Sequence, residues 1–310
     1  MGPSCHEGEL GVIEIVPSFL VSYDGADADQ HILDAAALGE SIGGASRLYT
    51  AVAHYCVFGA VPRGNYKKEF RCYASIPRDG SYEIPLLIAA LAQQQALYAP
   101  LYAEGIKFIF AYVLKAIKDQ WTKSSSTERI VEALVDAIKE QARAHAEVQM
   151  VATNGLVKAN DNLASLNARL IDTLPALAES TRSNGRALVE PVGKSCRSLT
   201  QLAQTADAVV IDEPEAAVIK STEPLEISNV ATFKCDSITE VNTETGHCRI
   251  VVDGFQGTLV GKITDPSLSN PHNVYTQALN AHTGFTFTAK PVKRDGVVKT
   301  LYISDAKELA

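Results

Sequence analysis

The stretch YDGADADQHILD, residues 23–34, holds four aspartates and one histidine within twelve positions. Carboxylates and imidazoles bind divalent metals and act as general acids or bases. An EF-hand loop needs glycine at its sixth position and glutamate at its twelfth, and this stretch provides neither. His31 and Asp34 are three residues apart, on one face of a predicted helix, but no third or fourth ligand stands near them in the sequence.

The start of a helix explains the same residues without a metal. An aspartate at the N-cap accepts hydrogen bonds from free backbone N–H groups and opposes the helix dipole. We therefore expect Asp27 or Asp29 to cap a helix, and we expect no metal and no cofactor. If the chain nevertheless has a catalytic site, His31, Asp34 and Ser81 are the residues to test.

Other sequence patterns that carry chemistry are incomplete. VGKS, residues 192–195, ends like a phosphate-binding P-loop, but Leu188 stands where that loop needs its first glycine. Ser81 has no GxSxG context, and no two histidines form an HExxH pair. The six cysteines form no CxxC pair, as a zinc site would need: Cys5, Cys56, Cys72, Cys196, Cys235 and Cys248. We predict that the protein is not an enzyme.

Length and charge limit the remaining classes. A chain of 310 residues favours two domains. Its net charge of −8 provides no overall basic field for nucleic acid or for an anionic membrane. The opening MGPSCHEGEL has neither the basic start nor the apolar run of a secretory signal. We therefore expect a cytoplasmic protein with reduced thiols.

Residues 1–123 favour a mixed α/β domain. A β-branched and aromatic stretch predicts a strand at Phe19–Tyr23, and YKKEFRCYASI (66–76) alternates like a half-buried strand. Apolar residues at helical spacing from Asp29 to Tyr55 predict two helices, separated at Gly43-Gly44. Residues 84–117 are the most apolar segment, but Gln, Pro, Glu and Lys interrupt them. A buried helical pair is favoured there, and a membrane-inserting element remains the alternative.

Residues 124–204 are predicted to form a helical region. Five leucines within it step at spacings typical of a coiled-coil seam, and we call them the central leucines: Leu156, Leu163, Leu166, Leu170 and Leu177. The run covers about three heptads, so it fits either self-association or packing against the preceding helix. Self-association is the preferred interpretation, and it predicts a homo-oligomer.

From residue 205 the composition changes twice. Residues 205–227 are acidic and marked by prolines, which is typical of a linker. Residues 228–310 contain five short strand patterns separated by Gly, Asn, Asp and Pro, which predict a small all-β domain, either a barrel or a sandwich. The overall fold class is therefore α+β.

Small five-stranded barrels often bind single-stranded nucleic acid through aromatic side chains and a basic groove. The last predicted hairpin carries four candidate phosphate contacts: Lys290, Lys293, Arg294 and Lys299. Acidic and basic residues nearly cancel between residues 226 and 310, however. Nucleic-acid binding is therefore possible but not favoured, and so is membrane contact.

Three stretches form a pattern together: YDGADADQHILDAAALGESIGGASRL, RDGSYEI and VNTETGHCRI…GFQGTLVGKITDP. Through this pattern the sequence resembles an uncharacterised two-domain family of bacterial and prophage-encoded proteins. The matching positions are Tyr23, Gly25, His31, Asp34, Gly44, Gly80, Ser81 and Tyr82. It implies an N-terminal α/β domain, a small C-terminal β module, and a context of conflict with phages or other mobile elements. Our prediction is a non-enzymatic protein that oligomerises and acts through protein–protein interaction. Single-strand binding by the β domain and membrane action by residues 84–117 are the alternatives.

Overall fold

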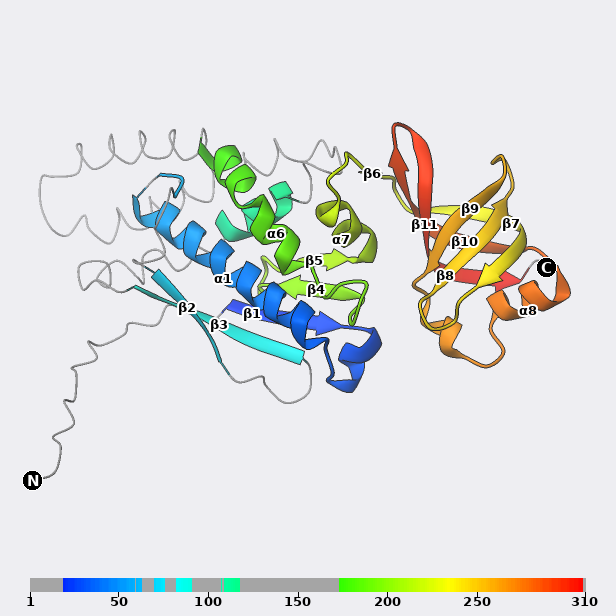
Figure 1. Ribbon diagram of the computed structural model, residues 1–310, viewed down its shortest axis with the longest axis horizontal. Helices are drawn as coiled ribbons and strands as arrows, with labels where there is room; N and C mark the ends of the chain where they lie inside the picture. The colour runs from blue at the N-terminus through cyan, green and yellow to red at the C-terminus, as the bar shows by residue number, and fades with distance from the viewer. Residues whose placement is uncertain are drawn as a thin grey trace, which may run out of the picture. The chain divides into compact units, whose positions relative to one another are not determined.

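The computed structural model describes residues 19–58, 60–62, 70–75, 82–90, 107, 109–117 and 173–308 (Figure 1). The chain divides into two compact units at the step from Ile211 to Asp212. Unit 1 contains the described residues up to Ile211, and unit 2 contains those from Asp212 onward. The protein therefore has an α+β fold in which each unit has its own sheet.

Unit 1 is built on a five-stranded sheet in the order β2-β3-β1-β4-β5. The central strand β1 runs antiparallel to β3 and β4, and β3 runs antiparallel to β2. The strand bounds are β1 Phe19–Asp24, β2 Phe70–Ala74, β3 Tyr82–Ala90, β4 Ser198–Gln201 and β5 Val209–Asp212. The predicted strands at Phe19–Tyr23 and within residues 66–76 are thus confirmed.

Helices pack against this sheet through an aromatic core. Figure 1 shows the long helix α1, Ala35–Phe58, running along the sheet with α6, Arg182–Leu188, beside it. The ring of Tyr49 in α1 stacks against both Phe19 of β1 and Phe110, with centroid distances of 4.5 and 3.8 Å. Residues 109–117 are helical, and most of their side chains are fully buried. The buried hydroxyl of Tyr49 donates to Gln201 Oε1 of β4 at 3.0 Å.

Two expectations for the N-terminal region were wrong. A single helix, α1, passes through Gly43-Gly44 without a break, because Gly44 lies against the backbone of α6 and lets the two helices approach closely. Residues 84–90 belong to strand β3 instead of a helix, since pairing with β1 and β2 satisfies their backbone groups. None of the helices described here is long and apolar enough to cross a membrane.

Unit 2 contains a closed five-stranded barrel in which β9-β8-β7-β10-β11 lie side by side and β11 returns to β9. Its strands are β7 Ala231–Val241, β8 His247–Val252, β9 Thr258–Ile263, β10 Phe285–Arg294 and β11 Val297–Glu308. All five predicted strands are confirmed, and the barrel is chosen over the sandwich. The third and fifth strands, β9 and β11, run parallel, while the other pairs run antiparallel.

A helix, α8 (Val274–Ala281), connects the third strand of the barrel to the fourth and contributes Tyr275 and Ala278 to its core. A strand order of first, second, third, fifth, fourth, with the helix in this position, is the topology of the OB-fold. The hydroxyl of Tyr275 in α8 donates a 2.8 Å hydrogen bond to the buried carboxylate of Asp265, so each of these two buried polar groups has a partner.

The expected linker, residues 205–227, is ordered secondary structure. It contains β5, then helix α7 (Glu213–Lys220), then the two-residue strand β6 (Glu226–Ile227) paired with β10. The acidic residues that suggested a linker instead cap α7 and contact basic residues of the barrel. The region predicted to be helical, residues 124–204, ends in a strand instead, because β4 (Ser198–Gln201) joins the sheet of unit 1.

Among the central leucines, only Leu177 falls within the described residues. Residues 173–180 are helical there, and Leu177 is completely buried in unit 1. Leu156, Leu163, Leu166 and Leu170 lie outside the described residues. Internal packing therefore accounts for one of the five positions, and self-association through the other four stays a prediction.

Candidate functional site

The aspartates of residues 23–34 serve the backbone. Asp34 Oδ1 accepts a 2.7 Å hydrogen bond from the N–H of Ala37, so Asp34 caps α1, and the expectation that Asp27 or Asp29 would cap it was wrong. Asp27 and Asp29 lie in a short 3-10 helix, Ala26–Gln30, where Asp29 accepts from the N–H of Gly25 at 2.8 Å. His31 ends that helix with a left-handed φ of 57° and is exposed.

These residues do not assemble into a site within the part of the chain that the structure describes. No group of three or more His, Cys, Asp or Glu residues there is placed to hold a metal ion. Ser81, the third residue proposed for testing, lies outside the described residues. The loop containing VGKS packs against the 3-10 helix instead, where the carbonyl of Ser195 accepts from the N–H of Ala28 at 3.1 Å. Its lysine, Lys194, forms an ion pair with Glu190.

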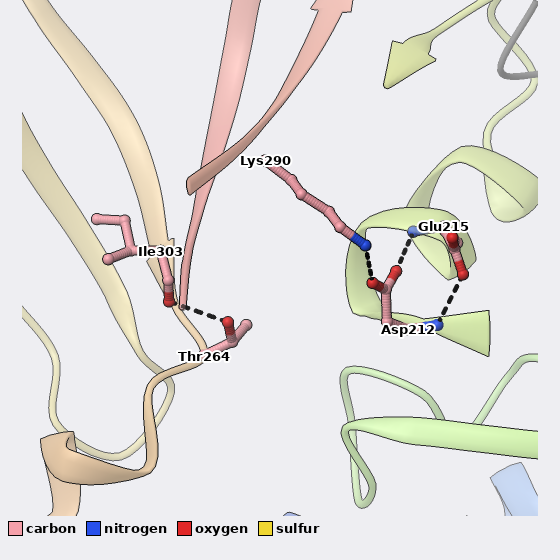
Figure 2. A network of polar contacts seen from close by, with 5 residues as sticks. All are labelled: Asp212, Glu215, Thr264, Lys290 and Ile303. Carbon is pink, nitrogen blue, oxygen red and sulfur yellow. Dashed lines mark hydrogen bonds and ion pairs between the residues drawn. The ribbon is translucent and has the colours of Figure 1, made fainter. Parts of the chain in front are cut away.

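Basic residues of the barrel meet the acidic residues that precede it (Figure 2). Lys290 of β10 forms an ion pair with Asp212, and Lys262 of β9 forms one with Glu213 at 2.9 Å. The Lys262–Glu213 pair is the more buried, with side chains 17% and 9% exposed. A buried pair of this kind fixes geometry, since separating its members would leave an unpaired charge away from water.

The same pattern continues toward the tip of the β10–β11 hairpin. Arg294 Nη1 donates to Glu223 at 2.7 Å, and Lys293 lies opposite Glu226 in the β10–β6 register. Lys299 is exposed on β11. Three of the four predicted phosphate contacts, Lys290, Lys293 and Arg294, therefore face acidic residues of this chain.

Asp212 has two roles at this contact. Its carboxylate accepts from the N–H of Glu215 at 3.1 Å, while Glu215 accepts in return from the N–H of Asp212, which makes a capping box at the start of α7. Partial burial lowers the pKa of Lys290, but its hydrogen bond to Asp212 and the nearby carboxylates raise that pKa overall. Close by, Thr264 donates to the carbonyl of Ile303 at 2.9 Å and joins the end of β9 to β11 (Figure 2).

Apolar side chains accompany the ion pairs. Val218 of α7 and Val292 of β10 form one buried apolar cluster. Three partly buried side chains pack against it: Leu225, Ile227 and Tyr302. Burial raises the pKa of the Tyr302 phenol to about 12, and the carboxylates of Glu213 and Asp212 add to that shift. Residues 212–227 are thus attached to the outside of the barrel by charge and by apolar contact together.

The sequence interpretation missed this contact, although it noted both partners. An acidic segment and a basic hairpin were each recognised, but they were assigned to a linker and to a nucleic-acid surface. The usable signal was charge complementarity. The predicted linker carries acidic residues at 212, 213, 223 and 226, and the predicted β domain that follows it carries basic residues at 262, 290, 293 and 294. Sequence distance hid the pairing, because 71 residues separate Arg294 from Glu223.

A second surface lies on the outward face of β7, β8 and β9, the first three strands of the barrel. Its exposed side chains include Lys234, Asp236, Glu240, His247, Arg249 and Val260. Arg249 and Glu240 pair at 3.2 Å while both stay largely exposed, so charges of both signs alternate here. Val260 is 44% exposed, and Phe255 of the β8–β9 turn is 36% exposed. In OB-folds this is the side on which ligands bind.

Comparison with known families places both units. Residues 19–220 match the model of a domain of unknown function, DUF7946. The chain belongs to this DUF7946 family. Residues 236–307 match a second model, the family of unknown function DUF7947, which begins inside β7 and ends in β11. The expected two-domain family without an assigned function is confirmed, and a bacterial or prophage origin stays a prediction. No curated protein and no solved structure matches the chain.

Proposed function

We propose that this chain is a non-enzymatic, cytoplasmic protein that oligomerises and binds other proteins, with the barrel of unit 2 as its recognition module. One observation carries the proposal: the basic residues around the β10–β11 hairpin face acidic residues of the chain itself. What the barrel offers on β7–β9 is a surface of mixed charge with exposed Val260 and Phe255. Such a surface suits a protein partner better than a phosphate backbone, which needs unpaired cations.

Self-association is assigned to the central leucines. Light scattering of the purified chain at two concentrations and two salt levels is expected to give a stable multiple of 33.2 kDa. Replacing Leu163 and Leu166 by glutamate should then give folded monomers, because the charges would oppose association through an apolar seam. A monomeric parent chain would contradict self-association, and a variant that unfolds would show that these leucines pack internally.

Single-strand binding is the second candidate function, and the OB topology of the barrel is the observation that favours it. In this case Lys293 and Lys299 would contact phosphates. An electrophoretic or fluorescence titration with a single-stranded oligonucleotide should then show affinity that falls steeply with salt and weakens when both lysines become glutamine. Negligible binding at low salt would remove this candidate.

The phage-conflict context belongs to the proposal through the family resemblance alone. Membrane action by residues 84–117 has less support, because their described parts form strand β3 and a helix buried in unit 1. Leakage assays on anionic and neutral vesicles test it directly. Dye release by the intact chain would favour membrane action over protein recognition.

A further inference from the structure

Residues 221–227, Ser-Thr-Glu-Pro-Leu-Glu-Ile, connect α7 to the barrel and run along the tip of β10; we call them the acidic strap. Glu223 accepts from Arg294 at 2.7 Å. In the β6–β10 register Glu226 lies opposite Lys293 and Ile227 opposite Val292. The N–H of Ser228 then donates to the carbonyl of Pro291 at 2.8 Å, which extends the same antiparallel path.

The strap has a pattern that the barrel matches residue by residue. Its two acidic residues, at 223 and 226, meet the two basic residues at 293 and 294. Its two aliphatic residues, Leu225 and Ile227, pack against the cluster formed by Val292 of the barrel and Val218 of α7, as Tyr302 does. Backbone pairing with β10 supplies the third kind of contact. These are the components of peptide recognition by strand addition, where main-chain bonds give affinity and side-chain positions give specificity.

The contacts that attach the strap to the barrel are more exposed than those that attach α7, the helix before it. β6 has only two residues, and Arg294 and Glu223 keep 44% and 53% of their side-chain surface exposed. Exposed ion pairs contribute little and are screened by salt. By contrast, α7 is attached through the buried Glu213–Lys262 pair and through Val218, which is 1% exposed. These differences favour release of the strap while α7 remains attached.

We propose that the tip of β10, with Val292, Lys293 and Arg294, is a docking site for an extended acidic–aliphatic peptide of a partner protein, and that the acidic strap is its internal competitor. This inference rests on the proposed protein-binding function and names the class of partner. The observed occupant defines the ligand chemistry: two carboxylates three residues apart, with one aliphatic side chain between them and one after them. A nucleic acid would satisfy Lys293 and Arg294 but would leave the apolar part of the site without a partner.

Tethering explains why the intact chain should bind such a peptide weakly. A linked segment occupies its site at a high effective concentration, in the millimolar range for a short connection. A partner peptide must therefore displace the strap, and weakening the strap should reveal the site. Reversing the charges of the strap achieves this, because lysines at positions 223 and 226 would repel Arg294 and Lys293 while leaving them available.

The probe for the test is a fluorescent synthetic peptide with the sequence of residues 221–229, STEPLEISN. Fluorescence polarisation at low salt should show at least tenfold tighter binding to the full chain carrying Glu223→Lys and Glu226→Lys than to the parent chain. Adding Lys293→Gln and Arg294→Gln to that variant should reverse the gain. Glu240→Lys is the matched control, since it reverses an exposed acidic residue paired with Arg249 elsewhere on the barrel.

Three results would overturn the proposal. One is absence of peptide binding by the strap variant at low salt, with an unchanged circular dichroism spectrum. Another is equally tight binding of a peptide in which both glutamates are glutamine. The third is tighter binding of a nine-nucleotide single strand than of the peptide, which would make the tip a polyanion site. Light scattering tests the proposed oligomer separately, so it can succeed while the docking site fails.

A measurement on the unaltered chain covers the case in which the strap variant does not fold. Hydrogen exchange should show that the amides of Glu226 and Ile227 exchange at least tenfold faster than those of the β7 core, with the difference growing as salt rises. Protection equal to that of β7 at every salt concentration would show that the strap is a permanent part of the barrel.

Discussion

Gly44 is the residue that sets how closely α1 and α6 can approach. A Cβ atom built there would lie 2.6 Å from the backbone nitrogen of Leu188 and 2.7 Å from the carbonyl oxygen of Asn184. Gly44→Ala should therefore lower the free energy of unfolding by about 1–3 kcal/mol, the usual cost of overpacking, even though alanine favours helices. Urea denaturation followed by circular dichroism measures this change.

Gly39 provides the matched control in the same helix, because no atom lies within 4 Å of the position that an added Cβ would take. Gly39→Ala should stabilise the protein by about 0.5–1 kcal/mol through lost backbone freedom in the unfolded chain. Equal effects at the two glycines would contradict a close contact at Gly44.

The thiols of Cys235 and Cys248 are buried in the core of the barrel. Burial raises the pKa of each to about 12 from 9.0, and nearby acidic groups add to the shift. Above pH 9 the unfolded chain loses these protons while the folded barrel keeps them. The free energy of unfolding should therefore be unaffected below about pH 9 and should fall as pH rises from 9 toward 12.

Urea unfolding of unit 2 at pH 8, 9 and 10 measures that dependence. The double variant Cys235→Ala and Cys248→Ala should have a flatter profile above pH 9, whatever its stability at neutral pH. Parallel profiles for the two proteins would exclude the thiols as the cause, and the raised pKa of Tyr302 would then be the next group to test.

At the residue scale, the type of chemistry was easier to predict than the residue that performs it. Helix capping was the correct reason for aspartates near residue 30, but Asp34 is the cap. The positive φ of Gly25 and of Ala26 places a 3-10 helix before α1, and the sequence contains no periodic signal for that intervening turn. A cap can be assigned only when the first turn of its helix is known.

At the scale of elements, α7 is held to the barrel by a buried charge pair. Lys262→Met would leave the carboxylate of Glu213 buried without its partner. The free energy of unfolding of unit 2 should therefore fall by about 3 kcal/mol, the lower end of the range for breaking a buried ion pair. Adding Glu213→Gln should restore most of this loss, because no unpaired charge remains. Denaturant titrations of the two single variants and the double variant form the cycle that measures the coupling.

The exposed pair between Arg249 and Glu240 is the control for that cycle, since both side chains are more than 60% exposed. Arg249→Met should change stability by less than about 1 kcal/mol. A loss at Lys262→Met no larger than this would mean that α7 is not fixed by its ion pair.

Alternation of apolar and polar residues made the barrel strands predictable, because each is buried on one face and exposed on the other. Strand β3 is different: Ile84, Pro85 and Leu86 are consecutive and all buried, so period-two alternation is lost. A short apolar run of this kind fits a buried helix equally well. The pairing partners β1 and β2 decide the matter. β2 is the strand just before β3, but β1 lies far away in the sequence.

For the whole molecule, the placement of the boundary between the two units has a measurable consequence. The change to β patterns suggested a domain beginning at residue 228, whereas the contacts group residues from Asp212 with the barrel.

Two fragments test this boundary. A fragment of residues 212–310 keeps the partners of Lys262, Lys290 and Arg294 and the packing of Val218 on Val292. A fragment of residues 228–310 exposes Val292 and Tyr302 and removes the acidic partners Glu213, Asp212 and Glu223 of these three basic residues. The longer fragment should therefore melt at least 10 °C higher, since a loss of a few kcal/mol shifts a domain of this size by about 4–8 °C per kcal/mol. Calorimetry of the two fragments measures the difference, and it should narrow when Glu213→Gln and Val218→Ala are introduced into the longer one. Equal melting temperatures would mean that α7 does not stabilise the barrel. Residues 213–220 would then belong to unit 1, as the last helix of the DUF7946 match.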